Sequence, residues 1–316
     1  MVFCNDNIEN NLWIPRRKEV SIEHFGDHQR LAYMIGINED FLGLKKVFNN
    51  YGCDFVQAHN LWCAYYSYKI GLPTIFSDWE YYLNHLDYFP LKSNGQSIFG
   101  LPFALMRRFR ASGFVKHLLK NIPIIVTNKN QQEKYQSLGA KECFVVPNVP
   151  LKFEQDYAFS VNVEKEKVVT TSYIGQMSSD TWALRDASEV PSLWSRFDIG
   201  KLHIFEKENY LPHLNVLRKL RSFHFNLLYW KPFPDHKYYL QNKAFMASVV
   251  GIPTIISSSL TATINLLGSY AIPVSNLEEI PKIIKHYEPV SLPLQENHLW
   301  EYYESNIKKA YCQVKN

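Results

Sequence analysis

Several features that mark common protein classes are missing from this chain of 316 residues. Its five cysteines are an odd number without a C-x-x-C pair, which argues against a disulfide framework or a cysteine zinc site and favours small buried residues in a reducing compartment. No run of roughly 18 uncharged apolar residues occurs, so no membrane-spanning helix is predicted. The first residues lack the basic and apolar regions of a signal peptide. We therefore expect a cytoplasmic protein.

Metal-centred and nucleic-acid-binding functions are not indicated either. No D-x-D or H-x-H triplet occurs, so the sequence favours no metal-dependent enzyme. The 34 basic and 30 acidic residues leave a formal charge of only +4. No basic stripe runs along the chain, so nucleic acid is not an expected partner. Glycine is also scarce, at 13 residues, which is few for an enzyme that cradles phosphate in glycine-rich loops.

Apolar and aromatic residues, in contrast, are abundant. Hydrophobic residues make up 46% of the chain and aromatic residues 15%, which is enough to build a core and argues against disorder. The length suits two domains of roughly 150 residues each. Short strand-like runs alternate with helix-length segments, a pattern typical of βαβ units on a parallel sheet. The sequence therefore predicts an α/β fold.

The expected elements fall into two groups on either side of a polar stretch at residues 151–167, which we interpret as the connection between domains. In the first half we expect strands at residues 18–23, 54–59, 74–77, 122–127 and 143–146, and helices at 39–51, 61–70, 103–120 and 131–138. In the second half we expect strands at 168–174, 201–205, 225–229 and 253–257, and helices at 238–250 and 298–311. The predicted domains are residues 1–155 and 163–290, followed by a final helical segment at 294–316.

The residues that follow each strand carry the functional signal, because parallel sheets bind ligands at the carboxyl ends of their strands. The informative segments are DFVQAHN at residues 54–60, TIFSDWEYY at 74–82, SYIGQMSS at 172–179, NKAFMASVVGIPTIISSS at 242–259 and LWEYYESNIKKAY at 299–311. In order and pattern they resemble segments of the family-4-like glycosyltransferases of the GT-B type. The resemblance covers roughly residues 54–311.

This resemblance implies two Rossmann-like domains that face each other across a cleft, with a C-terminal helix that returns to the N-terminal domain. It also implies a hexosyltransferase that works without a metal or a cofactor and retains the anomeric configuration. Such an enzyme moves a sugar from a nucleotide-sugar donor to a glycan or lipid-linked acceptor, as in polysaccharide biosynthesis. Another GT-B chemistry, nucleotide-sugar epimerisation, is an alternative.

The second domain is expected to hold the diphosphate of the donor with backbone N–H groups and cationic side chains. Gly175, just after a strand, would let the backbone approach a phosphate closely, and Gln176 follows it where the family has a cation. Arg185 is the nearest cation and a candidate for the phosphate clamp, or else a surface arginine on a helix. Lys243, next to Asn242 near a helix start, is the second candidate, because a lysine there is unfavourable unless it meets an anion.

A hydroxyl-rich segment follows the last predicted strand of this domain. Ser258, Ser259 and Thr261 could donate hydrogen bonds to phosphate or ribose, or they could form an ordinary polar loop. The family carries a ribose-binding glutamate in the preceding helix, and Met246 stands at the matching position here. A thioether cannot accept two ribose hydroxyls as a carboxylate does.

The first domain is expected to supply the catalytic side chains. The candidates are His59, Asp78 and Glu80, at the ends of two predicted strands, although a lone histidine at a strand end can also be structural. Trp79 fills the position of the histidine in the D-x-H-E pattern of the family. The replacements at Trp79 and Met246 leave a second hypothesis open, a protein that keeps the fold and binds a nucleotide sugar or glycan without turnover.

A basic amphipathic segment at residues 103–120 suggests where the protein could meet a membrane. It interleaves five cations with apolar residues, so it could lie on an anionic membrane surface. The cations are Arg107, Arg108, Arg110, Lys116 and Lys120. The alternative is a solvated helix face that packs on its own sheet.

Overall fold

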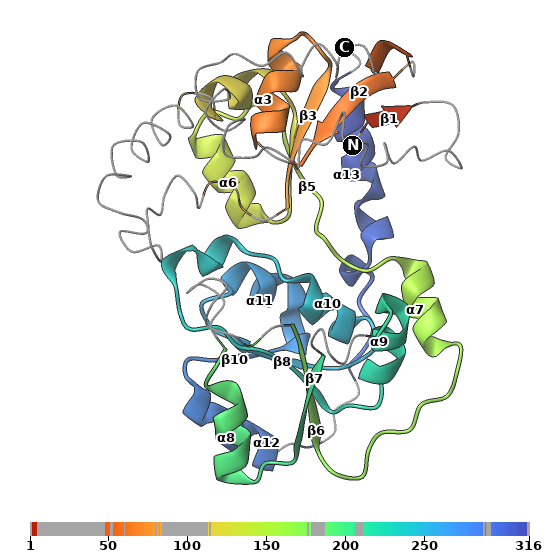
Figure 1. The fold of residues 1–316 in the computed structure, drawn as a ribbon, viewed down its shortest axis with the longest axis vertical. Coiled ribbons are helices and arrows are strands. Elements are labelled where there is room, and N and C mark those ends of the chain that lie inside the picture. The colour runs from red at the N-terminus through yellow and green to blue at the C-terminus, as the bar shows by residue number, and fades with distance from the viewer. Residues whose placement is uncertain are drawn as a thin grey trace, which may run out of the picture. The chain divides into compact units, whose positions relative to one another are not determined.

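The computed structural model describes residues 2–4, 48–50, 53–59, 61–79, 81, 83, 113, 115–175, 177, 187–205, 211–286, 288 and 292–314. The chain divides into two compact units (Figure 1). The first comprises Met1–Val146 and Ser305–Asn316, and the second Pro147–Glu304. Each unit is built around a five-stranded, largely parallel sheet with helices, so the predicted α/β class with two Rossmann-like units is confirmed.

The sheet of the first unit follows the order of its strands in the chain, β1-β2-β3-β4-β5. Its strands are β1 (Val2–Cys4), β2 (Cys53–Ala58), β3 (Thr74–Asp78), β4 (Ile124–Val126) and β5 (Cys143–Val145). The edge strand β1 runs antiparallel to β2, and the other pairs are parallel. Every residue of β3 and β4 is buried, as expected for parallel strands that are covered on both faces.

Helices α3 (Leu61–Lys69) and α6 (Lys129–Ser137) follow β2 and β4. Asn128 caps α6 by accepting a hydrogen bond from the backbone N–H of Gln131 at 3.0 Å, as a short polar side chain does at a helix start. Residues 48–50 are helical, within the predicted helix at 39–51. The predicted strand at 18–23 lies outside the described residues.

The final helix α13 (Glu304–Cys312) belongs to the first unit, as the predicted fold class requires. The amide of Asn306 donates to the backbone oxygen of Val145 at 3.0 Å. The hydroxyl of Tyr311 donates to Oε1 of Gln57 at 2.9 Å, and its ring lies 4.9 Å from that of Phe55. These contacts attach the end of the chain to β2 and β5.

The second sheet is entirely parallel and has the order β10-β9-β8-β6-β7. Its strands are β6 (Thr170–Ile174), β7 (Lys201–Phe205), β8 (Phe225–Leu228), β9 (Thr254–Ser257) and β10 (Ala271–Val274). The chain moves from β6 to one side and then returns to the other side with β8. The strand order therefore reverses between β6 and β8, and open α/β sheets bind ligands at such switch points.

Helices cover both faces of this sheet. Helices α8 (Val190–Phe197) and α12 (Ile280–Lys285) pack with one core cluster, and α9 (His213–Leu220) and α10 (Asn242–Ser248) with the other. The remaining elements are α11 (Thr261–Leu267) and the 3-10 turns η6 (Pro234–Tyr238), η7 (Gly268–Tyr270), η8 (Leu277–Glu279), η9 (Glu296–His298) and η10 (Trp300–Tyr303).

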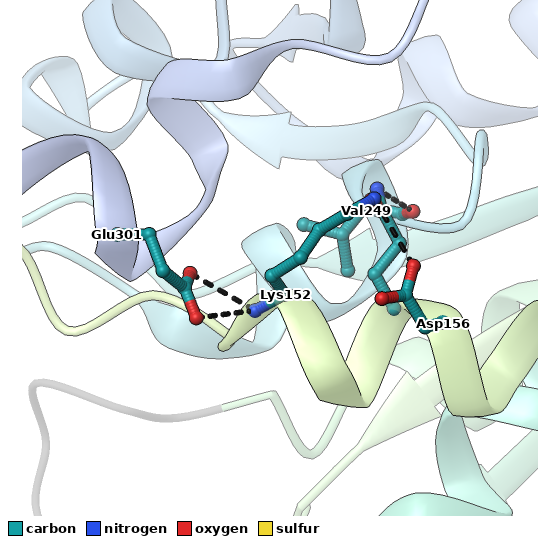
Figure 2. A network of polar contacts seen from close by, with 5 residues as sticks. Lys152, Asp156, Val249 and Glu301 are labelled. Carbon is teal, nitrogen blue, oxygen red and sulfur yellow. Dashed lines mark hydrogen bonds and ion pairs between the residues drawn. The ribbon is translucent and has the colours of Figure 1, made fainter.

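The polar stretch at 151–167, predicted as a connection, instead contains a helix of the second unit, α7 (Lys152–Phe159). Its buried residues are Gln155 and Ala158, and the Gln155 amide donates to the backbone oxygen of Val249 at 2.8 Å. Figure 2 shows the polar contacts around Lys152 at the start of this helix. The prediction missed α7 because charged residues flank its short buried face.

The helix predicted at 238–250 is also shorter in the structure. It begins at Asn242, and the residues before it form the turn η6 and an extended segment. Thr263 holds this segment, because its hydroxyl donates to the backbone oxygen of Tyr239 and accepts from the backbone N–H of Gln241, both at 3.0 Å. A tertiary contact therefore competes with helix extension at this point.

Candidate functional site

The predicted donor residues of the second unit gather where its parallel strands end. Gly175 follows β6, and Ser258 follows β9, two strands away across β8. Because all five strands run in the same direction, both residues lie at the carboxyl edge of the sheet. This edge includes the point between β6 and β8 where the strand order reverses.

Gly175 and Lys243 meet at this edge. The backbone of Gly175 has φ +130°, a conformation that favours glycine, and its N–H donates to the backbone oxygen of Phe205 at 3.1 Å. A Cβ atom at this position would collide with Nζ of Lys243 and would lie 3.7 Å from its Cε. The ammonium group of α10 therefore lies directly beside a bare stretch of backbone at the end of β6.

The neighbours of this pair are described only in part. Asn242 is the first residue of α10 and is partly buried, and its side chain forms no hydrogen bond with any described residue. Gln176 and Arg185 both lie outside the described residues. Of the two cations predicted to clamp the diphosphate, only Lys243 can therefore be located.

Met246 lies in the core of the second unit. It is 5% exposed and packs in the cluster that α10 shares with α9 and β7. The position that carries a glutamate in the resembling family therefore serves here as a core position of α10.

The serine-rich segment after β9 forms a hydrogen-bonded turn. The backbone N–H of Ser258 donates to the backbone oxygen of Val274 at 2.8 Å. Oγ of Ser259 lies 3.1 Å from Oγ of Ser257 and 2.9 Å from Nδ1 of His236. Thr261 is exposed at the start of α11. The turn is thus tied both to its own strand and to η6.

His236 was not predicted as a site residue. It is fully buried in η6, among the aromatic rings of Trp230, Phe233 and Tyr239. In the sequence, it could have been recognised only as a histidine in an aromatic segment that directly follows a strand. Its partner Ser259 lies 23 residues further along the chain, and no local pattern reveals that contact.

The predicted catalytic residues of the first unit lie in different environments. His59 follows β2 with an exposed side chain, and its ring centroid is 6.0 Å from that of Trp79, which follows β3. Although His59 is exposed, the surrounding protein withdraws part of its ring from water, which lowers its pKa below the usual value, so the imidazole is neutral at pH 7. Glu80 lies outside the described residues.

Asp78 is only 3% exposed, and its carboxylate accepts a hydrogen bond from the Tyr135 hydroxyl at 2.5 Å. Burial, reinforced by the charge of Asp78, raises the pKa of Tyr135 well above its usual value. Burial and the same charge also raise the pKa of the nearby Cys143 thiol to about 12. Asp78 therefore joins the end of β3 to α6 inside the first unit.

The described part of the chain contains neither a membrane-spanning helix nor a metal-binding cluster of side chains. No helix among these residues is long and apolar enough to cross a membrane. No group of three or more His, Cys, Asp or Glu side chains in the same ranges could hold a metal ion.

The sequence matches no protein-family model and no curated protein sequence. Solved structures do match in fold. WaaG, a glycosyltransferase involved in lipopolysaccharide biosynthesis, aligns with a TM-score of 0.57 at 12% identity, over 93% of this chain and 85% of its own. HepE from Anabaena, crystallised with UDP, aligns with a TM-score of 0.54 at 9% identity, over 87% and 80%.

The α,α-trehalose 6-phosphate synthase of Burkholderia multivorans aligns with a TM-score of 0.52 at 10% identity, over 92% of this chain and 75% of its own. These neighbours share the two-domain GT-B fold. The chain therefore has the GT-B fold, as its sequence predicts.

Proposed function

We propose that this protein is a glycosyltransferase that binds its nucleotide-sugar donor at the carboxyl edge of the second sheet. The observation that carries the proposal is the convergence of Gly175 and Lys243 there. A glycine with positive φ at a strand end allows close approach of an anion, and an adjacent ammonium supplies the countercharge. The fold it shares with HepE, which was solved with UDP and with UDP-glucose, supports the same ligand class.

The proposed reaction needs neither a metal nor a cofactor. Lys243 would neutralise the diphosphate as it leaves, a charge that develops most strongly in the transition state. Sugar transfer from such a donor otherwise depends on positioning the two substrates, and we assign it to the retaining class that the sequence resembles. Gly175, Gln176, Arg185, Asn242, Ser258 and Thr261 are the further residues that we assign to donor binding.

The acceptor is proposed to be a glycan or a lipid-linked glycan, bound at the carboxyl edge of the first sheet. A neutral imidazole at His59 could accept a hydrogen bond from the acceptor hydroxyl at pH 7. Glu80 is assigned to the same chemistry from its place in the sequence. Asp78 would act indirectly, by holding the end of β3 through Tyr135.

A thermal-shift screen with UDP-, GDP- and CMP-sugars tests donor binding. One nucleotide class should raise the melting temperature, because a ligand that binds only the folded state stabilises it. Lys243→Ala should weaken the affinity about tenfold or more if the ammonium pairs with phosphate. Lys282→Ala, an exposed lysine of α12, is the matched control and should leave affinity unchanged. Equal affinity in wild type and Lys243→Ala would contradict the assignment.

Binding without turnover is the second candidate, and the buried Met246 favours it because no carboxylate occupies that position. The two functions differ in one measurable product. A transferase releases free nucleoside diphosphate over time when donor and acceptor are present, whereas a binding protein returns the donor intact. Product release should therefore be followed by chromatography after the screen has identified the nucleotide.

We also propose that the segment at 103–120 contacts an anionic membrane surface. Residues 115–121 form a helical stretch whose apolar side is buried within the protein, so the exposed cations would make this contact. Its buried side chains include Val115, Leu118 and Leu119, and its exposed cations are Lys116 and Lys120. Sedimentation with phosphatidylglycerol vesicles should be lost in a Lys116→Glu, Lys120→Glu variant. Binding that persists in this variant would reject this contact.

A further inference from the structure

The three consecutive serines at the end of β9 have different roles in the turn. Ser257 is fully buried, and its Oγ lies 3.1 Å from that of Ser259. Oγ of Ser259 also lies 2.9 Å from Nδ1 of His236. Ser258 is a partly exposed residue, and within the described ranges nothing hydrogen-bonds to its hydroxyl. Two of the three hydroxyls are therefore occupied inside the protein, and one is available to a ligand.

His236 is packed on several sides, so it can hold this turn in one position. Its ring is fully buried, with centroids 5.4 Å from Trp230, 5.9 Å from Phe233 and 6.3 Å from Tyr239. The chain just beyond η6 is held as well. The hydroxyl of Thr263 in α11 donates to the backbone oxygen of Tyr239 and accepts from the backbone N–H of Gln241, both at 3.0 Å. The segment that follows His236 is therefore tied to α11, and the ring of His236 packs against Trp230, just after β8.

The contact has the same effect in either tautomer of His236. If Nδ1 is an acceptor, the Ser259 hydroxyl donates to it and accepts from Ser257. If Nδ1 carries the proton, it donates to Ser259, which then donates to Ser257. In both cases the Ser259 hydroxyl bonds to His236 on one side and to Ser257 on the other.

We propose that His236 is a positioning residue of the donor site. It anchors Ser259 and thereby presents the hydroxyl of Ser258 to the phosphate or ribose of a nucleoside diphosphate. This inference rests on the proposed donor-binding function. It changes the role of Ser259, which would hold the turn in place, and leaves Ser258 to contact the ligand. A turn that is ordered before binding avoids the entropy loss of ordering it with the ligand.

The experiment measures Kd for UDP, GDP and CDP by calorimetry at pH 7.5. His236→Phe keeps an aromatic ring among its three neighbours and removes both ring nitrogens, including the Nδ1 that meets Ser259. His236→Asn keeps a polar atom near the position of Nδ1 and removes the ring. If the nitrogen positions the turn, His236→Phe should weaken binding about fivefold or more and His236→Asn should restore most of it, whereas a packing role predicts the reverse order.

The serine variants supply the second readout. Ser258→Ala should weaken binding about fivefold through loss of the ligand contact, and Ser259→Ala should match His236→Phe. The double variant His236→Phe, Ser259→Ala should bind no more weakly than either single variant, because both remove the same contact. Ser259→Ala alters only one small side chain, so it keeps the test valid if the His236 variants fold poorly.

The outcomes separate the two proposals. Wild-type affinity in His236→Phe or Ser259→Ala overturns the positioning role, and so do additive effects in the double variant. If the wild-type protein binds none of the three nucleotides, the donor-binding function itself fails and the role of His236 fails with it.

Discussion

Glu301 accepts the backbone N–H of Lys152 with both of its carboxylate oxygens, each at 2.9 Å, although 149 residues separate the two in the chain (Figure 2). Lys152 is the first residue of α7, and the first N–H groups of a helix have no partner within it. Leu151 directly precedes Lys152, and the carboxylate of Glu154 accepts its backbone N–H at 2.7 Å. Two carboxylates therefore complete the start of α7, and one of them comes from the segment that leads to α13.

Glu301→Ala should lower the free energy of unfolding of the second unit by about 1 kcal/mol, the usual effect of removing a helix cap. Glu301→Gln should cost less, because the amide oxygen can still accept but no longer carries the charge that the helix dipole favours. Urea denaturation measures both. Glu296→Ala is the control, since its exposed side chain bonds to nothing in the described segments. A midpoint equal to wild type for Glu301→Ala would show that the contact does not stabilise α7.

Gly175→Ala should lower both stability and nucleotide affinity. The new Cβ would collide with Nζ of Lys243, and φ +130° is strained for alanine. Gly251→Ala is a matched control, because Gly251 also has a positive φ, +85°, but a Cβ there meets nothing within 4 Å. Both variants should lose about 1 kcal/mol of stability. Only Gly175→Ala should weaken binding, and equal affinities in the two variants would remove Gly175 from the donor site.

Tyr311 should make the first unit sensitive to alkaline pH. Burial raises its pKa from 10.0 to about 12, so the unfolded chain loses this proton first. The stabilisation is present below pH 10 and is lost as the pH rises toward 12. Tyr311→Phe should show a smaller fall in melting temperature between pH 9 and 11 than wild type. Tyr302→Phe, at an exposed tyrosine, should behave as wild type, and identical curves for all three proteins would contradict the argument.

His298 should make the second unit sensitive to acid. Burial lowers its pKa below 6.5, although its hydrogen bond to the backbone oxygen of Leu266 opposes the shift. Nδ1 is buried with no partner in the described part of the chain, so protonation there would bury an unpaired charge. Stability is therefore present above pH 6.5 and lost as the pH falls below it.

His298→Phe fits between the rings of Phe245 and Tyr270 and removes this titration. Its melting temperature should fall less between pH 7.5 and 5.5 than that of wild type, whereas the exposed-site control His286→Gln should follow wild type. A wild-type pH profile for His298→Phe would place the acid-sensitive group elsewhere.

Local patterns were sufficient to predict most of the strands. The strand predicted at 201–205 is β7 (Lys201–Phe205), and those at 74–77 and 253–257 differ from β3 and β9 by one residue. The runs of β3 and β9 are recognisable because a strand buried on both faces is largely apolar and β-branched. The edge strand β7 is only partly buried, and its short apolar run was still sufficient. The short helix α7 was missed because its buried face includes an amide, Gln155, among charged neighbours.

The sequence by itself determined the α/β class, the two units, the position of Gly175 after a strand and that of Lys243 at a helix start. Only the tertiary structure decided that these two residues touch, that Met246 faces the core and that His236 holds Ser259. The reason is the strand order, which places β8 between β6 and β9. Which strands pair is set by the assembly of the whole sheet and not by local sequence. This pairing brings the ends of separate strands together at one edge.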